Sequence, residues 1–111
     1  VRAYPSDERV VVMATGGLSH DPGGVDYFTV HEDFDRWFMG LLEDGDIAQV
    51  ERELPFEKYL EGGDGGGGEL LAWLVAMGAA AEAGRPNAES VFYVPSVPLR
   101  CGMGGSYWDL T

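Results

Sequence analysis

The stretch that decides the fold is RVVVMATGGLSHDPGG, residues 9–24. Its first five residues, 9–13, are apolar after the arginine, and such a run predicts a strand buried on both faces of an α/β sheet. The glycine pair 16–17 permits a positive φ or the close approach of another group, while the Pro-Gly-Gly at 22–24 rules out an immediate helix. Ligands of open α/β sheets bind beyond the carboxyl ends of strands, so we expect His20 to be catalytic. The alternative interpretation is a turn that ends in an incidental polar histidine.

Length and composition describe one ordinary packed domain. The chain has 111 residues, of which 45% are hydrophobic and 23% charged, and no apolar run approaches the roughly 18 residues of a membrane span. A net charge of −12 repels phosphate backbones and anionic bilayers, which argues against nucleic acids and membranes as partners. The single Cys101 cannot form an internal disulfide and no signal peptide opens the chain, so we predict a cytoplasmic protein. Because the chain starts at Val1 rather than Met, we also expect a fragment that lacks upstream sequence.

Hydrophobic spacing predicts three helices. Residues 32–43 carry an apolar stripe behind an acidic first turn, which favours a helix that packs against the core. A short second helix is expected over 47–54, and the alanine-rich stretch 69–83 predicts a third that Gly84 stops. The segment after the second helix has three expected apolar anchors: Phe56, Tyr59 and Leu60. His31 stands at the N-cap of the first helix, where it needs no role as a ligand.

One further strand and a glycine-rich tail follow the helices. The β-branched and aromatic residues over 90–94 predict a strand, which Pro95 and Pro98 are expected to end. The tail at 100–110 is either a loop over a pocket or a short final strand, and its composition does not decide between the two.

Six glycines among the eight residues 61–68 lead directly into the third helix. Such a run is typical of a flexible linker or of a loop that feeds a helix, and the apolar residues after it favour the loop. A nucleotide site is disfavoured because no lysine follows and Glu69 would repel an anion. Two roles stay open for Glu69, namely compensation of the helix dipole and a carboxylate ligand at the mouth of a site.

Four segments resemble, in order, those of the class III extradiol ring-cleaving dioxygenases. They are Thr15-Gly16-Gly17-Leu18-Ser19-His20, the helix start Glu32-Asp33-Phe34-Asp35, the glycines 65–68 with Glu69 and Trp73, and Tyr93-Val94-Pro95 followed by Gly102-Met103-Gly104. The resemblance runs the length of the chain but covers only the C-terminal part of the family's catalytic domain. It implies that residues 1–111 form the C-terminal part of a three-layer α/β/α sandwich with a mixed sheet.

The resemblance also implies a function. The family holds a mononuclear non-haem Fe(II) with two His and one Glu, uses a separate His as acid/base, and opens catechol-type rings with O₂. Carried over by motif, His20 corresponds to the acid/base and Glu69 to the metal ligand. We further expect Gly17, Ser19 and Met103 to contact the substrate. For Ser19, two other roles stay open, namely to orient the imidazole or to remain a turn hydroxyl. The two iron-binding histidines belong to the absent N-terminal part. We therefore expect the isolated chain to be inactive, to need its missing half or a partner chain, and to belong to a homo-oligomer.

Two other functions were weighed against this one. The incomplete iron ligands leave open a non-catalytic truncated or split half-domain that acts as a structural or interaction module. A hydrolase built on Ser19 and His20 is disfavoured because adjacent residues rarely place a hydroxyl and an imidazole in nucleophile–base geometry, and no G-x-S-x-G turn occurs.

Overall fold

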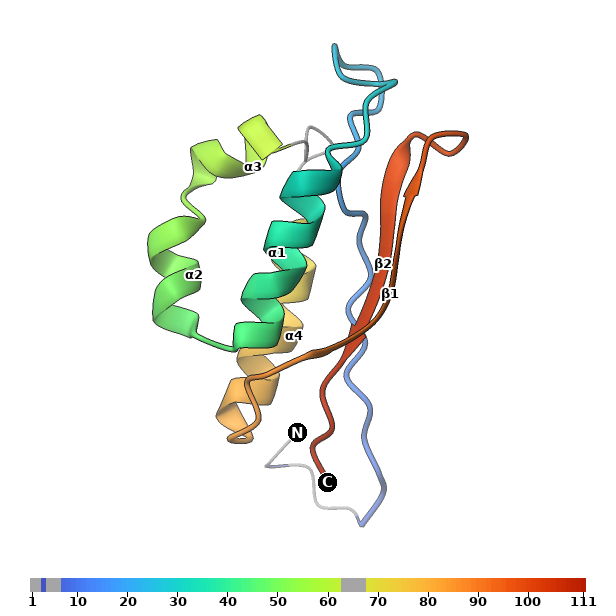
Figure 1. Ribbon diagram of the computed structural model, residues 1–111. Coiled ribbons are helices and arrows are strands. Elements are labelled where there is room, and N and C mark those ends of the chain that lie inside the picture. Colours follow the sequence, from blue (N-terminus) through green and yellow to red (C-terminus); the bar gives the residue numbers. More distant parts are fainter. Residues whose placement is uncertain (1–2, 4–6, 63–67) are drawn as a thin grey trace.

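The computed structural model describes residue 3, residues 7–62 and residues 68–111. In these residues the elements are α1 (Glu32–Asp44), α2 (Ile47–Glu53), α3 (Phe56–Gly62), α4 (Leu70–Glu82), β1 (Glu89–Ser96) and β2 (Cys101–Tyr107). Figure 1 shows α1 between the small helices α2 and α3 on one side and the β1–β2 hairpin on the other, with α4 behind it. Helices together with a sheet agree with the predicted α/β class, and the three-layer sandwich stays a prediction.

The central helix α1 confirms the predicted helix over 32–43. Its inner face buries Phe38 and Leu42 completely, and both belong to one hydrophobic core with residues of the other helices. Gly45 ends the helix in the left-handed conformation, with φ at 68°. A Cβ there would come within 2.8 Å of the Asn87 backbone nitrogen. Because the Asn87 side chain also donates to the carbonyls at the end of α1, the α4–β1 connection closes this helix.

The last helix, α4, confirms the third predicted helix and supplies Leu70 and Met77 to the core, both fully buried. Gly84 follows its end with φ at 76°, as expected of a helix stop. The glycines at 63–67 lie outside the described residues. In the described part of the chain, no helix combines the length and the apolar character needed to cross a bilayer.

Of the two middle helices, α2 follows the sequence prediction, whereas α3 was not predicted as a helix. α2 occupies most of the expected range 47–54. Tyr59 of α3 packs into the core at 7% exposure, whereas Phe56 and Leu60 are exposed. The prediction of three apolar anchors is therefore correct for Tyr59 and wrong for the other two, because only one face of this short helix meets the core.

The two strands form an antiparallel hairpin, so the tail is a strand over much of its length. The register runs from Glu89 opposite Tyr107 to Ser96 opposite Cys101. Pro95 does not end the first strand as predicted but lies inside it, opposite Gly102. A proline is tolerated there because one side of an edge strand makes no ladder hydrogen bonds.

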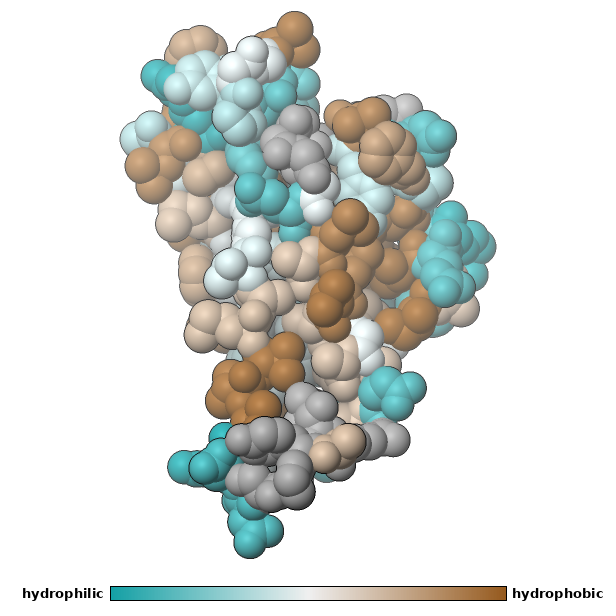
Figure 2. All heavy atoms as spheres, turned by 180° about the vertical axis from the view of Figure 1, so that it is seen from behind, coloured by the Kyte–Doolittle hydropathy of each residue, from teal (hydrophilic) through white to brown (hydrophobic). Residues whose placement is uncertain are grey.

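The prediction of a buried strand at 9–13 is wrong for this structure. These residues are extended but have no strand assignment, and Val11 and Met13 are 83% and 80% exposed. The run is apolar enough for burial, but a strand needs a neighbour for its amide groups, and the described residues provide none. Seen from behind, the molecule displays several exposed hydrophobic clusters (Figure 2).

Candidate active site

The turn that carries His20 is fixed to the rest of the fold at the two residues before it. Leu18 and Ser19 are both fully buried, and Leu18 belongs to the hydrophobic core. The amide of Gly102 on β2 donates to the Ser19 carbonyl at 2.9 Å. His20 follows directly, with its side chain 16% exposed. The imidazole is therefore partly exposed, while the two residues before it are anchored in the core.

The glycine pair before the turn allows close approach. A Cβ on Gly16 would lie 2.7 Å from the backbone oxygen of Glu69, and one on Gly17 would lie 2.9 Å from the His20 ring. Neither glycine has a positive φ. The sequence offered two reasons for these glycines, a positive φ and the close approach of another group. The structure shows the close approach, between segments that are 52 residues apart.

The segment that lies against the two glycines is the start of α4. Glu69 stands at the N-cap but makes no capping hydrogen bond with its side chain. Its carboxylate instead accepts a hydrogen bond from the amide of Gly17. Trp73, one turn later, donates its indole N–H to the Gly16 carbonyl at 3.2 Å. The four-residue spacing of Glu69 and Trp73 thus lets one helix hold both glycines of the turn.

His20 and Glu69, the two residues predicted to carry the chemistry, lie side by side. His20 Nε2 is 3.6 Å from Glu69 Oε1, and the Glu69 side chain is 46% exposed. His20 Nδ1 lies 2.7 Å from the Leu18 carbonyl oxygen. A carbonyl oxygen can only accept, so Nδ1 carries a hydrogen in either protonation state of the ring. Nε2 is the ring nitrogen that faces the carboxylate and is left for contact with another group.

A buried carboxylate that sequence reasoning missed lies beneath the turn. Asp35 of α1 is fully buried and accepts hydrogen bonds from the Ser19 amide at 2.7 Å, the Ser19 hydroxyl at 2.8 Å and the Tyr93 hydroxyl at 2.7 Å. Burial raises the pKa of Asp35 above its ordinary value, although the hydrogen bonds from Tyr93 and Ser19 oppose this. The signal in the sequence was its position, three residues before Phe38 on the apolar face of the helix.

The three residues predicted to contact substrate lie in different surroundings. The space that Gly17 leaves is filled by His20 and Glu69, so this glycine places both. Ser19 is fully buried with its hydroxyl bound to Asp35, and its contact with a substrate stays a prediction. Met103 is 41% exposed and alternates along β2 with glycines that face Leu18 and Met39, so it points to the opposite side. Its contact with a substrate stays a prediction.

The remaining histidine has a local partner. His31 Nε2 is 3.5 Å from Asp26 Oδ2, in the loop between His20 and α1. In residues 7–62 and 68–111, no group of three or more His, Cys, Asp or Glu side chains is arranged to hold a metal ion.

An imidazole and a carboxylate held together at the edge of an α/β core define a candidate acid/base site. Residues 1–98 match the family model of the catalytic LigB subunit of aromatic ring-opening dioxygenase, and the chain belongs to this family. The gallate dioxygenase of Pseudomonas putida is 29% identical over 97 residues, which are 87% of this chain and 28% of that protein. The chain therefore spans 28% of the length of this curated relative. No solved structure matches it. These matches confirm the family that the motifs predicted.

Proposed function

We propose that the chain forms part of an Fe(II)-dependent active site that opens the ring of a catechol-type aromatic with O₂ by extradiol cleavage. The observation that supports this most strongly is the 3.6 Å approach of His20 to Glu69 in a chain of the ring-opening dioxygenase family. Gallate, the compound named by the relative, is itself a catechol-type aromatic, and this supports the proposed class of substrate.

The residues present fit one part of an iron site. The Glu69 carboxylate is half-exposed and is not used for helix capping; its Oε2 accepts from Gly17, and its Oε1, beside His20, is the oxygen that can act as a single ligand. The described residues do not complete a set of donors, and we propose that two histidines from the rest of the catalytic domain do so. An Fe(II) ion held in part by Glu69 would bind substrate and O₂ and supply the redox chemistry of ring opening.

This chain then contributes proton transfer by His20 and the positioning of the His20 and Glu69 side chains. His20 Nε2 accepts a proton from a substrate hydroxyl and later returns it to the reacting oxygen, because Nδ1 is bound to the Leu18 carbonyl and Nε2 is the ring nitrogen that faces the site. The Leu18 carbonyl keeps Nδ1–H in place during both steps. Gly17 donates to Glu69 and so holds the carboxylate beside the imidazole.

The test uses the full natural protein reconstituted with Fe(II) without oxygen, followed by O₂ uptake with gallate and with catechol. His20→Ala should retain iron but lower the turnover number by about 100-fold or more, the usual contribution of a general acid/base. Glu69→Gln should lower the iron content. The matched controls are His31→Ala and Glu57→Gln, which remove the other imidazole and an exposed carboxylate. Normal ring cleavage by His20→Ala would reject the role of His20, and full iron occupancy in Glu69→Gln would reject that of Glu69.

The exposed apolar run suggests how the rest of the domain contacts this chain. Residues 10–13 are extended, apolar and without a strand neighbour among the described residues. We propose that the remainder of the catalytic domain, or a separate chain that replaces it, adds a strand there. A non-catalytic half-domain would share this contact but would show no iron-dependent O₂ uptake when the contact is formed.

A further inference from the structure

We propose that Asp35 is a positioning residue for His20, which acts through Ser19 and is completed by Tyr93 and Gly102. The inference rests on the proposed function of His20 and adds a residue that this function does not use. The turn at Ser19, the acidic start of α1, the Tyr-Val-Pro of β1 and the Gly-Met-Gly of β2 all meet at this one carboxylate.

Ser19 is held at each of its polar atoms. Its amide and its hydroxyl both donate to Asp35, at 2.7 and 2.8 Å. The hydroxyl oxygen also accepts from the backbone N–H of His31 at 3.0 Å, and the carbonyl accepts from Gly102 at 2.9 Å. Since His20 is the next residue, fixing Ser19 on α1 and β2 fixes the point from which the imidazole leaves the backbone.

A buried carboxylate suits this task because it is costly to leave without donors. Asp35 is fully buried, and its two oxygens accept three hydrogen bonds, two of them from Ser19. Moving Ser19 away would leave a buried acceptor unpaired, and bonds to a charged acceptor are stronger than those between neutral groups. Moving Ser19 away from Asp35 therefore costs more free energy than breaking a solvent-exposed hydrogen bond, since water would replace the lost partner in the exposed case.

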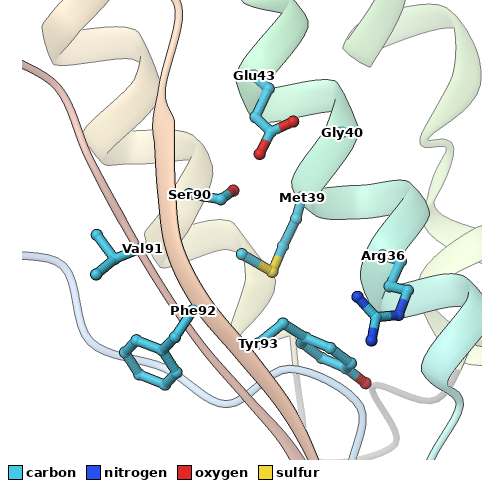
Figure 3. Close-up of a pocket in the computed structure, with 8 residues that line it drawn as sticks. All are labelled: Arg36, Met39, Gly40, Glu43, Ser90, Val91, Phe92 and Tyr93. Atoms are coloured by element: carbon cyan, nitrogen blue, oxygen red, sulfur yellow. The ribbon is translucent and has the colours of Figure 1, made fainter.

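Tyr93 and Gly102 bring the hairpin to the same carboxylate. Tyr93 extends from β1 toward α1, where the Arg36 guanidinium lies 4.6 Å from the centre of its ring (Figure 3). Burial and the nearby Asp35 raise the pKa of Tyr93, so its hydroxyl stays a neutral donor. A Cβ on Gly102 would overlap Asp35 Oδ2, and glycine is what lets β2 run against the carboxylate.

The experiment compares Asp35→Ala, Asp35→Asn and Tyr93→Phe in the full natural protein labelled uniformly with ¹⁵N. Its matched control is Asp33→Asn, an exposed carboxylate in the same turn of α1. The readouts are the exchange rate of the Ser19 amide and the tautomer of the His20 ring. In Asp35→Ala, that amide should exchange about tenfold faster or more, because its buried acceptor is gone. The ring should lose its fixed Nδ1–H tautomer.

The conservative variants separate positioning from general stability. Asp35→Asn keeps an acceptor for the Ser19 amide and should restore part of the tautomer preference, whereas Tyr93→Phe should weaken it without unfolding the protein. Wild-type amide exchange and tautomer in both variants would overturn the proposal, even if Asp35→Ala fails to fold. In ring cleavage, the expected effect is a lower kcat at unchanged KM. If His20→Ala cleaves normally, the proposed function fails, while the tautomer measurement still tests the positioning.

Discussion

At the scale of single residues, Gly17 is the position where the smallest change reaches the site. In Gly17→Ala the new methyl group would lie 2.9 Å from the His20 ring and 3.2 Å from Glu69 Oε2, so the two side chains must separate. We expect turnover of the full natural protein to fall by about 100-fold, which is typical for a misplacement of about 1 Å. The control is Gly40→Ala in α1, where a Cβ meets nothing within 4 Å. Steady-state kinetics with equal loss in both variants would contradict this expectation.

A second prediction at this scale concerns pH. Because burial raises the pKa of Asp35, the folded protein binds this proton more tightly than the unfolded chain. The contribution of Asp35 to the free energy of unfolding is therefore fully present below the ordinary pKa of an aspartate. It is lost as the pH rises through the raised pKa of Asp35 in the folded protein. Urea unfolding of Asp35→Asn and wild type should give a free-energy difference that moves in favour of the variant with rising pH and then levels off. The control is Asp33→Asn at an exposed position in the same turn of α1, and an equal slope in this control would contradict the assignment.

The sequence offered His20 and Glu69 as candidate residues, and the structure brings them within 3.6 Å of each other, but the sequence did not offer Asp35. The reason is physical. His20 and Glu69 belong to a local motif and a helix start that can be read directly from the chain. Asp35 looks like one of three acids that complement the dipole of α1. What distinguishes it is burial against Ser19 and Tyr93, which depends on contacts between residues 16 and 58 positions apart.

At the scale of elements, α2 depends on its N-cap. The Asp46 side chain accepts from the Gln49 amide at 3.1 Å, and α2 has seven residues with one of them, Val50, buried. Asp46→Ala should lower the free energy of unfolding by about 1 kcal/mol, the usual cost of losing such a cap. Glu51→Ala removes a charge from the exposed side of the same helix and serves as control. Urea denaturation that gives the same change for both variants would show that charge, rather than the cap, is responsible.

The same scale explains which elements the sequence predicted well. The helices α1, α2 and α4 were predicted from local properties, namely the spacing of apolar side chains, helix-forming composition and stop signals, and their bounds agree closely with the structure, whereas α3 was not predicted. The strands depend on partners. Residues 9–13 have the composition of a strand without a neighbour in the described residues, while β2 is glycine-rich yet is a strand. Gly102 and Gly104 let β2 lie against Leu18, and composition alone does not reveal such a contact.

At the scale of the whole molecule, the net charge of −12 opposes association between copies of the chain, whereas the exposed apolar surface favours it. Charge repulsion between copies is screened by salt, whereas contact between apolar side chains is not. The 111-residue chain should therefore associate more strongly in sedimentation velocity experiments as the salt concentration rises. Val11→Gln combined with Met13→Gln should reduce this association without changing the charge. Val25→Gln, at a residue that is 99% exposed in a separate loop, should not. A single monomeric species at both low and high salt would show that residues 10–13 stay exposed to solvent without driving association. That result would remove the support for a strand added there by the rest of the domain.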